Sequence, residues 1–133
     1  MEGTVKMINE QRRGLQLEAV KAAEDNHFHG FIQLPTGSGK AWVLIEILKR
    51  VNPKSCWYLC DSTLNRDKTF KDELKKWGAE KWIGKIKFMC YQTAYKLENH
   101  TVDLVLADEG DFSLTNKYAQ VYFNNYFKHL ILP

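Results

Sequence analysis

The segment LPTGSGKA, residues 34–41, carries the residues of this chain best suited to bind phosphate. It joins a short strand-like apolar run to a helix-like one, and such a turn points several backbone N–H groups at one spot beside the positive end of the helix dipole. Glycine allows a close backbone approach that a Cβ would block. Lys40 can reach the terminal phosphates as a point charge. We therefore predict a polyphosphate site rather than a turn with a solvated lysine, formed by Thr36, Gly37, Ser38, Gly39 and Lys40.

Ala41 stands where such a loop normally has a Ser or Thr hydroxyl that ligates Mg²⁺. A methyl group cannot act as this ligand, but Mg²⁺ keeps several waters and one of them can fill the position. The loss costs about 1–3 kcal/mol, the value of a hydrogen bond to a charged group. That corresponds to a metal site weakened roughly 10- to 100-fold. Binding of Mg²⁺ with the nucleotide is predicted to be weakened, not abolished.

Asp108 and Glu109 follow an apolar run in the segment VDLVLADEGDF. The carboxyl ends of parallel strands face the crevice where ligands bind. Asp108 is predicted to hold Mg²⁺ through water, and Glu109 to polarise a water for attack on a γ-phosphate. The alternative is that both acids are merely the polar start of a loop.

These residues need a framework that brings distant segments together. Apolar periodicity predicts a helix that stops at Asn26 and another that ends near Pro53, while Gly78 stops a third. The strand-like runs are apolar throughout, which indicates a parallel sheet covered by helices on both faces and hence an α/β fold. We predict helices over 10–25, 40–50 and 62–78, and strands over 30–35, 55–60, 85–91, 102–108 and 129–132.

Composition sets further limits. A chain of 133 residues is long enough for one domain, and its 44% apolar and 26% charged residues are ordinary for a globular protein. No membrane span or secretory signal is evident. Cys56, Cys60 and Cys90 have no metal-ligand spacing, and two of them fall inside apolar runs where a free cysteine acts as a small hydrophobe. We therefore expect no structural disulfide and a reducing cytoplasm. A net charge of +3 alone says little about nucleic acid.

The motifs and their order resemble the first RecA-like lobe of a superfamily 2 helicase or translocase, the group that includes DEAD-box, DEAH-box and restriction-type motors. LPTGSGK is similar to motif I, DEGD takes the place of motif II, and LQLEAV with Gln16 is similar to the segment that contacts adenine. The resemblance implies a three-layer RecA-like P-loop NTPase domain over residues 1–133, with ATP and Mg²⁺ as cofactors. Gln16 is then a nucleotide-binding residue together with the loop and Ala41.

Two further segments resemble parts of that lobe which contact the phosphate backbone of one strand of DNA or RNA. WYLCDSTLNRDKTFKDELKKW is similar to motif Ia and its helix, and MCYQTAYKL is similar to a TYQTL segment. Carried over by position, the nucleic-acid candidates are Ser62, Thr63, Gln92 and Thr93. Capping of the following helix explains Ser62 and Thr63 equally well.

The chain also departs from the family pattern. Gly110 and Asp111 give DEGD in place of a DEAD or DEAH box, and the sequence stops at LILP, where a Ser/Thr-Ala-Thr motif would begin. We therefore expect the second lobe, with its arginine fingers, to be absent. An arginine finger contributes about 10³- to 10⁵-fold in rate, or ~4–7 kcal/mol, which exceeds the effect of Ala41. This lobe is expected to hydrolyse ATP very slowly by itself.

Two functions remain open at this point: the ATP-binding lobe of a nucleic-acid-dependent ATPase, or a non-catalytic nucleic-acid- or protein-binding module derived from such a lobe. A small P-loop kinase is disfavoured because no Arg-bearing lid segment follows the loop. A lysine-rich stretch between 71 and 87, with Trp77 and Trp82, could bind nucleic acid, but the prediction is a solvated face with its tryptophans in the core.

Overall fold

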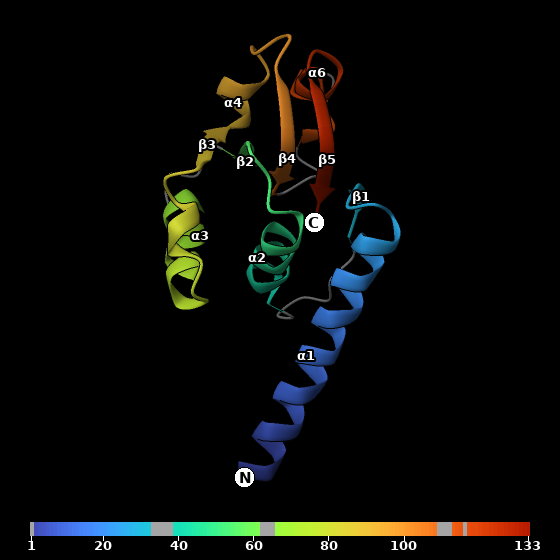
Figure 1. The fold of residues 1–133 in the computed structure, drawn as a ribbon, viewed down its shortest axis with the longest axis vertical. Helices are drawn as coiled ribbons and strands as arrows, with labels where there is room; N and C mark the ends of the chain where they lie inside the picture. Colours follow the sequence, from blue (N-terminus) through green and yellow to red (C-terminus); the bar gives the residue numbers. More distant parts are fainter. Residues whose placement is uncertain (1, 33–38, 62–65, 109–112, 116) are drawn as a thin grey trace.

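The computed structural model describes residues 2–32, 39–61, 66–108, 113–115 and 117–133. Within these ranges five strands form one sheet in the order β1-β5-β4-β2-β3, and all of its neighbouring strands pair in parallel (Figure 1). The predicted α/β class with a parallel sheet is confirmed. The elements are α1 (Glu2–Asp25), β1 (Gly30–Phe31), α2 (Lys40–Val51), β2 (Cys56–Cys60), α3 (Arg66–Lys76), the 3-10 turn η1 (Glu80–Trp82), β3 (Ile86–Cys90), α4 (Tyr91–Ala94), β4 (Thr101–Ala107), α6 (Gln120–Phe123) and β5 (Tyr126–Leu132).

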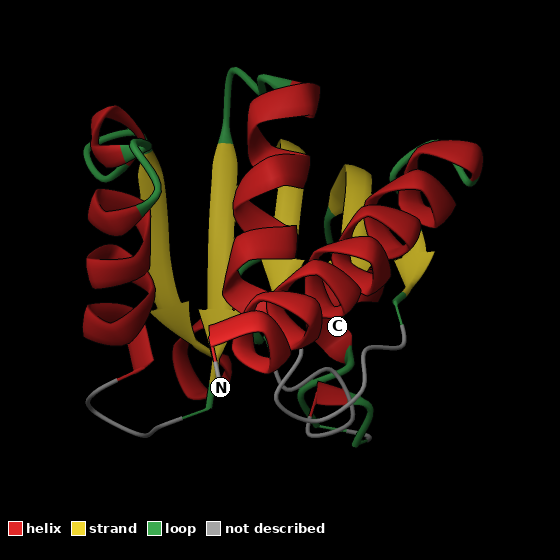
Figure 2. Ribbon diagram, turned by 90° about the horizontal axis from the view of Figure 1, so that it is seen from below, coloured by secondary structure: helices red, strands yellow, loops and turns green. Residues whose placement is uncertain are grey.

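The burial of strand β2 explains why its sequence is apolar at every position. All five of its residues are buried, and they alternate between two separate cores. Tyr58 packs with the residues of α1, α2 and α3, while Trp57 packs with those of α4 and α6. The long helices lie together on one face of the sheet (Figure 2). Both faces are therefore covered, as the continuous apolar run predicts.

Strands β3 and β5 depart from this prediction. In β3, at one edge of the sheet, Ile86 is buried but Lys87 is exposed, and β5 carries exposed Tyr126 and Lys128 beside buried Ile131. β3 is an edge strand with a neighbour on one side only, and β5 pairs with the two-residue β1 only at Ile131 and Leu132, so part of each strand stays in contact with water. The prediction of strands apolar throughout is correct for β2 and wrong for β3 and β5. The predicted strand over 30–35 is reduced to Gly30–Phe31 among the described residues.

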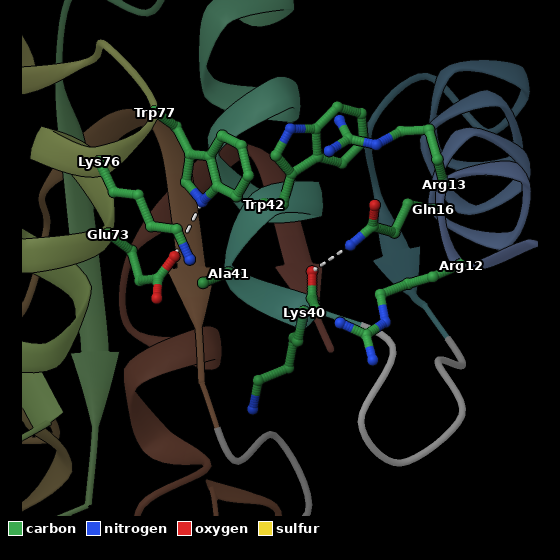
Figure 3. A pocket seen from close by; sticks show the side chains of 10 residues that line it. Arg12, Arg13, Gln16, Lys40, Ala41, Trp42, Glu73, Lys76 and Trp77 are labelled. Atoms are coloured by element: carbon green, nitrogen blue, oxygen red, sulfur yellow. Dashed lines mark hydrogen bonds between the residues drawn. The ribbon is translucent and has the colours of Figure 1, made fainter. Parts of the chain in front are cut away.

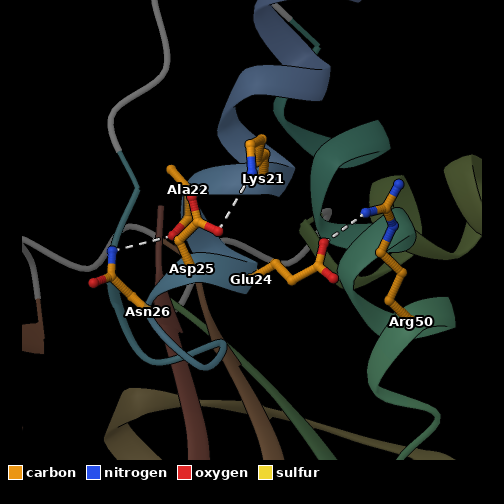
Figure 4. A network of polar contacts seen from close by, with 6 residues as sticks. All are labelled: Lys21, Ala22, Glu24, Asp25, Asn26 and Arg50. Carbon is orange, nitrogen blue, oxygen red and sulfur yellow. Dashed lines mark hydrogen bonds and ion pairs between the residues drawn. The ribbon is translucent and has the colours of Figure 1, made fainter.

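Helix α1 starts earlier than the predicted Glu10 and extends away from the body of the domain toward the N-terminus (Figure 1). Its end agrees with the prediction, since the Asn26 side chain donates to the carbonyl of Ala22 at 3.1 Å. An ion pair of 3.0 Å between Glu24 and Arg50 ties α1 to α2 (Figure 4). No helix in the described ranges is both long enough and apolar enough to cross a membrane.

Helices α2 and α3 end at residues in left-handed backbone conformations. Asn52, with φ 47°, donates its N–H to Leu48 and is followed by Pro53. Gly78, with φ 71°, follows α3, and the next N–H, from Ala79, bonds to the Leu74 carbonyl. Both predicted stops are confirmed, and their rigid ends fix where the following strands begin.

The lysine-rich stretch surrounds aromatic rings. Trp82 is buried, with Lys81 and Lys85 above its ring, and Lys71 lies 4.7 Å from the centroid of Phe88. The predicted core position is therefore correct for Trp82. Trp77 differs: it lies beyond the end of α3, is half-buried, and faces the cleft described below.

Substitution of Leu74 tests the packing of α3. Leu74 is fully buried, so Leu74→Ala is expected to lower the free energy of unfolding by about 2–5 kcal/mol through lost burial and a residual cavity. Lys75→Ala, on the exposed side of the same helix, should change it by less than ~0.5 kcal/mol. Urea denaturation measures both. Equal effects of the two variants would show that α3 does not pack through Leu74.

Candidate nucleotide site

Lys40, of the predicted phosphate loop, and Asp108, the first acid of DEGD, meet at the carboxyl end of β4. Lys40 is the first residue of α2, and Asp108 directly follows β4, whose ladder it continues by donating its N–H to Leu59 at 2.8 Å. Lys40 Nζ lies 2.5 Å from Asp108 Oδ1. The carboxylate side chain is 9% exposed and the lysine 37%. Two segments predicted to share a site are thus in direct contact through opposite charges.

Asp108 is held by two tyrosines from other elements. Tyr58, in β2, donates its hydroxyl to Asp108 Oδ2 at 2.5 Å, and Tyr91, the first residue of α4, donates to the Asp108 main-chain carbonyl at 2.7 Å. Burial raises the pKa of Tyr91, with a further contribution from Tyr122, so its hydroxyl stays protonated and remains a donor. Sequence reasoning missed both tyrosines. The available signal was that a tyrosine inside an apolar strand needs a partner for its hydroxyl.

Gln16 supports the loop from α1. Its side chain is 4% exposed, and Nε2 donates to the carbonyl of Gly39 at 3.2 Å. Gly39 has φ 79°, and a Cβ at this position would overlap the Gln16 amide. The left-handed backbone therefore favours glycine here, and a Cβ would also force the Gln16 amide to shift from its hydrogen bond to the Gly39 carbonyl.

A cleft of about 530 Å³ opens beside Lys40 (Figure 3). Its size is typical of a small-molecule site. Most of its charged side chains are cations and it has two indole rings; the lining residues are Arg12, Arg13, Gln16, Gly39, Lys40, Ala41, Trp42, Glu73, Lys76 and Trp77. The cleft therefore offers flat apolar faces and positive charge together, a combination that suits an anionic ligand with a planar ring.

Arg13 and Glu73 organise the two indoles. The Arg13 guanidinium carbon lies 3.8 Å from the centroid of the Trp42 ring and 5.5 Å from that of Trp77 (Figure 3). The Trp77 Nε1–H donates to Glu73 at 2.8 Å. Both tryptophans thus lie beside the same cation and border the same cleft, although Trp42 belongs to α2 and Trp77 directly follows α3. Trp42 and Arg13 were not among the predicted site residues.

Ala41 lines this cleft with a methyl group, so it brings no oxygen to a metal. Within the described part of the chain, no three His, Cys, Asp or Glu side chains come together as a metal centre. The Asp108 carboxylate is nevertheless chemically suited to a cation, because a cationic nitrogen already lies against one of its oxygens. With Asp108 as the protein ligand, Mg²⁺ would have to be held also by phosphates and water.

The remaining predicted residues divide into two groups. Gln92 and Thr93 lie in α4, immediately after Tyr91; Gln92 Oε1 is buried with no hydrogen-bond partner among the described residues, and Thr93 is exposed, with its hydroxyl 3.4 Å from Cys90 Sγ. Those that lie outside the described residues are Thr36, Gly37, Ser38, Ser62, Thr63, Glu109, Gly110 and Asp111.

The parallel α/β sheet, the helix beginning at the loop lysine and the acid after β4 define the class as a RecA-like ATP-binding lobe of the superfamily 2 helicases. The chain belongs to the family described as type III restriction enzyme, res subunit, whose family model matches residues 5–132. No curated protein sequence matches the chain. The predicted superfamily is therefore confirmed, together with the helicase-type ATP-binding domain.

Substitution of Gly39 tests the contact between α1 and the loop. Gly39→Ala introduces both a strained left-handed alanine and an overlap with Gln16, whereas Gly78→Ala, at φ 71° with open space around it, introduces the strain alone. The strain costs about 1–2 kcal/mol. We expect Gly39→Ala to lower the free energy of unfolding by clearly more than Gly78→Ala.

Removal of the Gln16 side chain separates the two effects. In a Gln16→Ala background the overlap is gone, so the further loss caused by Gly39→Ala should fall toward the value for Gly78→Ala. Chemical denaturation of the four variants measures this. An unchanged cost of Gly39→Ala in the Gln16→Ala background would contradict the close approach.

Proposed function

We propose that this domain binds Mg·ATP and is the first lobe of a nucleic-acid-dependent ATPase of the helicase or translocase type. The observation that carries the proposal is the contact between Lys40 and Asp108. In a P-loop ATPase the lysine contacts the phosphates, and the acid holds the metal ion that is bound to them. Their contact supports a single site in which both act on one ligand.

Lys40 and Asp108 are proposed to exchange partners when the nucleotide binds. Without ligand, the lysine neutralises a carboxylate that is largely removed from water. Lys40 then turns to the phosphates, and Asp108 Oδ1 becomes available to a metal-bound water. Bound Mg²⁺ supplies charge neutralisation of the phosphate oxygens. Thr36, Gly37, Ser38 and Gly39 are proposed to donate main-chain N–H groups to the phosphates, and Glu109 to orient the attacking water.

The cleft beside Lys40 is the proposed site of the nucleoside part. Trp42 and Trp77 offer indole faces to a base, and Arg12, Arg13 and Lys76 add positive charge near the phosphates. For a ring to stack on Trp42, Arg13 must give up part of its contact of 3.8 Å. Gln16 borders the same cleft, and this position supports the proposal that its side chain contacts adenine.

Nucleic acid is the proposed activator. Gln92 and Thr93 follow β3 at the same end of the parallel sheet as Asp108, and motif Ia contributes Ser62 and Thr63 in the proposal. Amides and hydroxyls at such loops suit contacts with the phosphate backbone of DNA or RNA. Rapid hydrolysis is proposed to need a second helicase lobe, in the same protein or in another chain, because an arginine supplied by it contributes about 10³- to 10⁵-fold.

A non-catalytic module is the second candidate, and Ala41 is the observation in its favour. The methyl group lies in the cleft at the position of the expected metal ligand. A domain that had lost ATPase activity could keep the sheet and bind nucleic acid or a protein. The two candidates differ in whether Mg·ATP binds.

Calorimetric titration with Mg·ATP distinguishes them. The unmodified protein should bind Mg·ATP. Lys40→Ala should lose most of this affinity because the lysine charge no longer neutralises the phosphates. Arg50→Ala is the control: it also removes a cation of α2, but one near the other end of the helix that pairs with Glu24. It should leave the affinity within about twofold.

Ala41→Thr adds the missing hydroxyl and should tighten binding in the presence of Mg²⁺ by about 10- to 100-fold, the range set by one hydrogen bond to a charged group. Without Mg²⁺ the same variant should bind ATP like the unmodified protein. No detectable binding by either protein at millimolar nucleotide would contradict the ATPase proposal and favour the non-catalytic module.

A further inference from the structure

The two oxygens of the Asp108 carboxylate have different partners. Oδ1 lies 2.5 Å from Lys40 Nζ, at the start of α2, whereas Oδ2 accepts from the Tyr58 hydroxyl of β2 at 2.5 Å. A carboxylate that bonds in this way to two different elements has its plane and its rotamer defined. The Tyr58 hydroxyl thus helps to fix the carboxylate plane in which the other oxygen faces Lys40.

Tyr58 is well placed to act as a fixed support. It lies in the middle of β2, is 2% exposed, and pairs in register with Leu106, two residues before Asp108. Its ring stacks on Phe70 at 4.4 Å and 18°, and it contacts Phe88 at 5.7 Å and 51°. Because aromatic rings from α3 and β3 enclose it, the tyrosine cannot change its direction without disturbing the core.

The absence of a hydroxyl at position 41 makes this support more important. Ala41 contributes a methyl group where a metal ligand is expected. Binding of Mg²⁺ would therefore depend more strongly on how the Asp108 carboxylate is oriented. Groups that orient a metal-binding carboxylate commonly affect metal affinity by about 10- to 100-fold. An oriented carboxylate is therefore the part of the metal site that this chain has kept.

We propose that Tyr58 is a positioning residue of the nucleotide site: by holding Oδ2, it presents Oδ1 of Asp108 to the Mg²⁺ that accompanies ATP. This inference rests on the proposed function, since it assumes that Mg·ATP binds here. Tyr58 touches neither the nucleotide nor the metal in this account. It acts only through Asp108.

Tyr91 provides a matched control. It is also a buried tyrosine that donates a hydrogen bond to Asp108, but its acceptor is the main-chain carbonyl. Tyr58→Phe and Tyr91→Phe each remove one hydroxyl and keep the ring. A purely structural role for both tyrosines predicts similar losses of stability and no selective effect on Mg²⁺, whereas the proposal separates them.

The experiment titrates Mg²⁺ into the protein in the presence of ATP and follows ATP binding by tryptophan fluorescence, with a parallel titration of ATP in EDTA. Tyr58→Phe should raise the half-saturating Mg²⁺ concentration by about tenfold and leave metal-free ATP binding within twofold. Tyr91→Phe should lower the unfolding midpoint but leave the half-saturating Mg²⁺ concentration within twofold. In an Asp108→Asn background, Tyr58→Phe should have no further effect on Mg²⁺.

Each outcome decides the proposal. Binding of Mg·ATP by the unmodified protein together with an unchanged Mg²⁺ requirement in Tyr58→Phe would overturn the role of Tyr58 alone. The same applies if Tyr91→Phe changes the requirement equally, or if metal-free binding falls as far as Mg²⁺-supported binding. Failure of the unmodified protein to bind Mg·ATP would overturn this inference and the proposed function together.

Discussion

The ion pair between Lys40 and Asp108 connects two segments that are far apart in sequence, the start of α2 and the end of β4. A carboxylate that is 9% exposed is costly to leave without a counter-ion, and removal of one partner of such a pair is strongly unfavourable. The position of α2, which begins at this lysine, is therefore coupled to the end of β4. The Gln16 side chain donates a hydrogen bond to the carbonyl of Gly39, the residue before Lys40, and so links α1 to the start of α2.

The buried strands make this pair possible. β2 and β4 are neighbours in the sheet, and both are covered on their two faces. The position of the carboxyl end of β4 relative to β2 is therefore fixed. Tyr58 and Tyr91 then fix the side chain and the main chain of Asp108 separately. Hydroxyls in a core of low polarity have to find partners, and here both partners belong to the proposed metal-binding residue. Requirements of the core and of the proposed site thus coincide in Tyr58, whereas Tyr91 serves the core by satisfying a main-chain carbonyl.

Much of the framework could be predicted because its signals are local. The apolar runs of β2 and β4, the stop at Gly78 and the glycine before Lys40 each follow from short-range chemistry. The early start of α1 could not, since Gly3, Thr4 and Val5 ahead of Glu10 have low helix propensity. The partial exposure of β3 and β5 depends on their place in the sheet, and strand order is not encoded in any single segment. Tyr58, Arg13 and Trp42 were missed for the same reason: their roles depend on which residues lie across from them.

The central claim is that Lys40 and Asp108 act as one unit in the nucleotide-free domain. A double-mutant cycle in the free energy of unfolding measures this directly, with the unmodified protein, Lys40→Ala, Asp108→Asn and the double variant compared without nucleotide. The account predicts that the double variant loses less stability than the sum of the single losses, by about 1–3 kcal/mol, within the range for residues in contact. Losses that add to within ~0.5 kcal/mol would contradict the pairing and the shared site built on it.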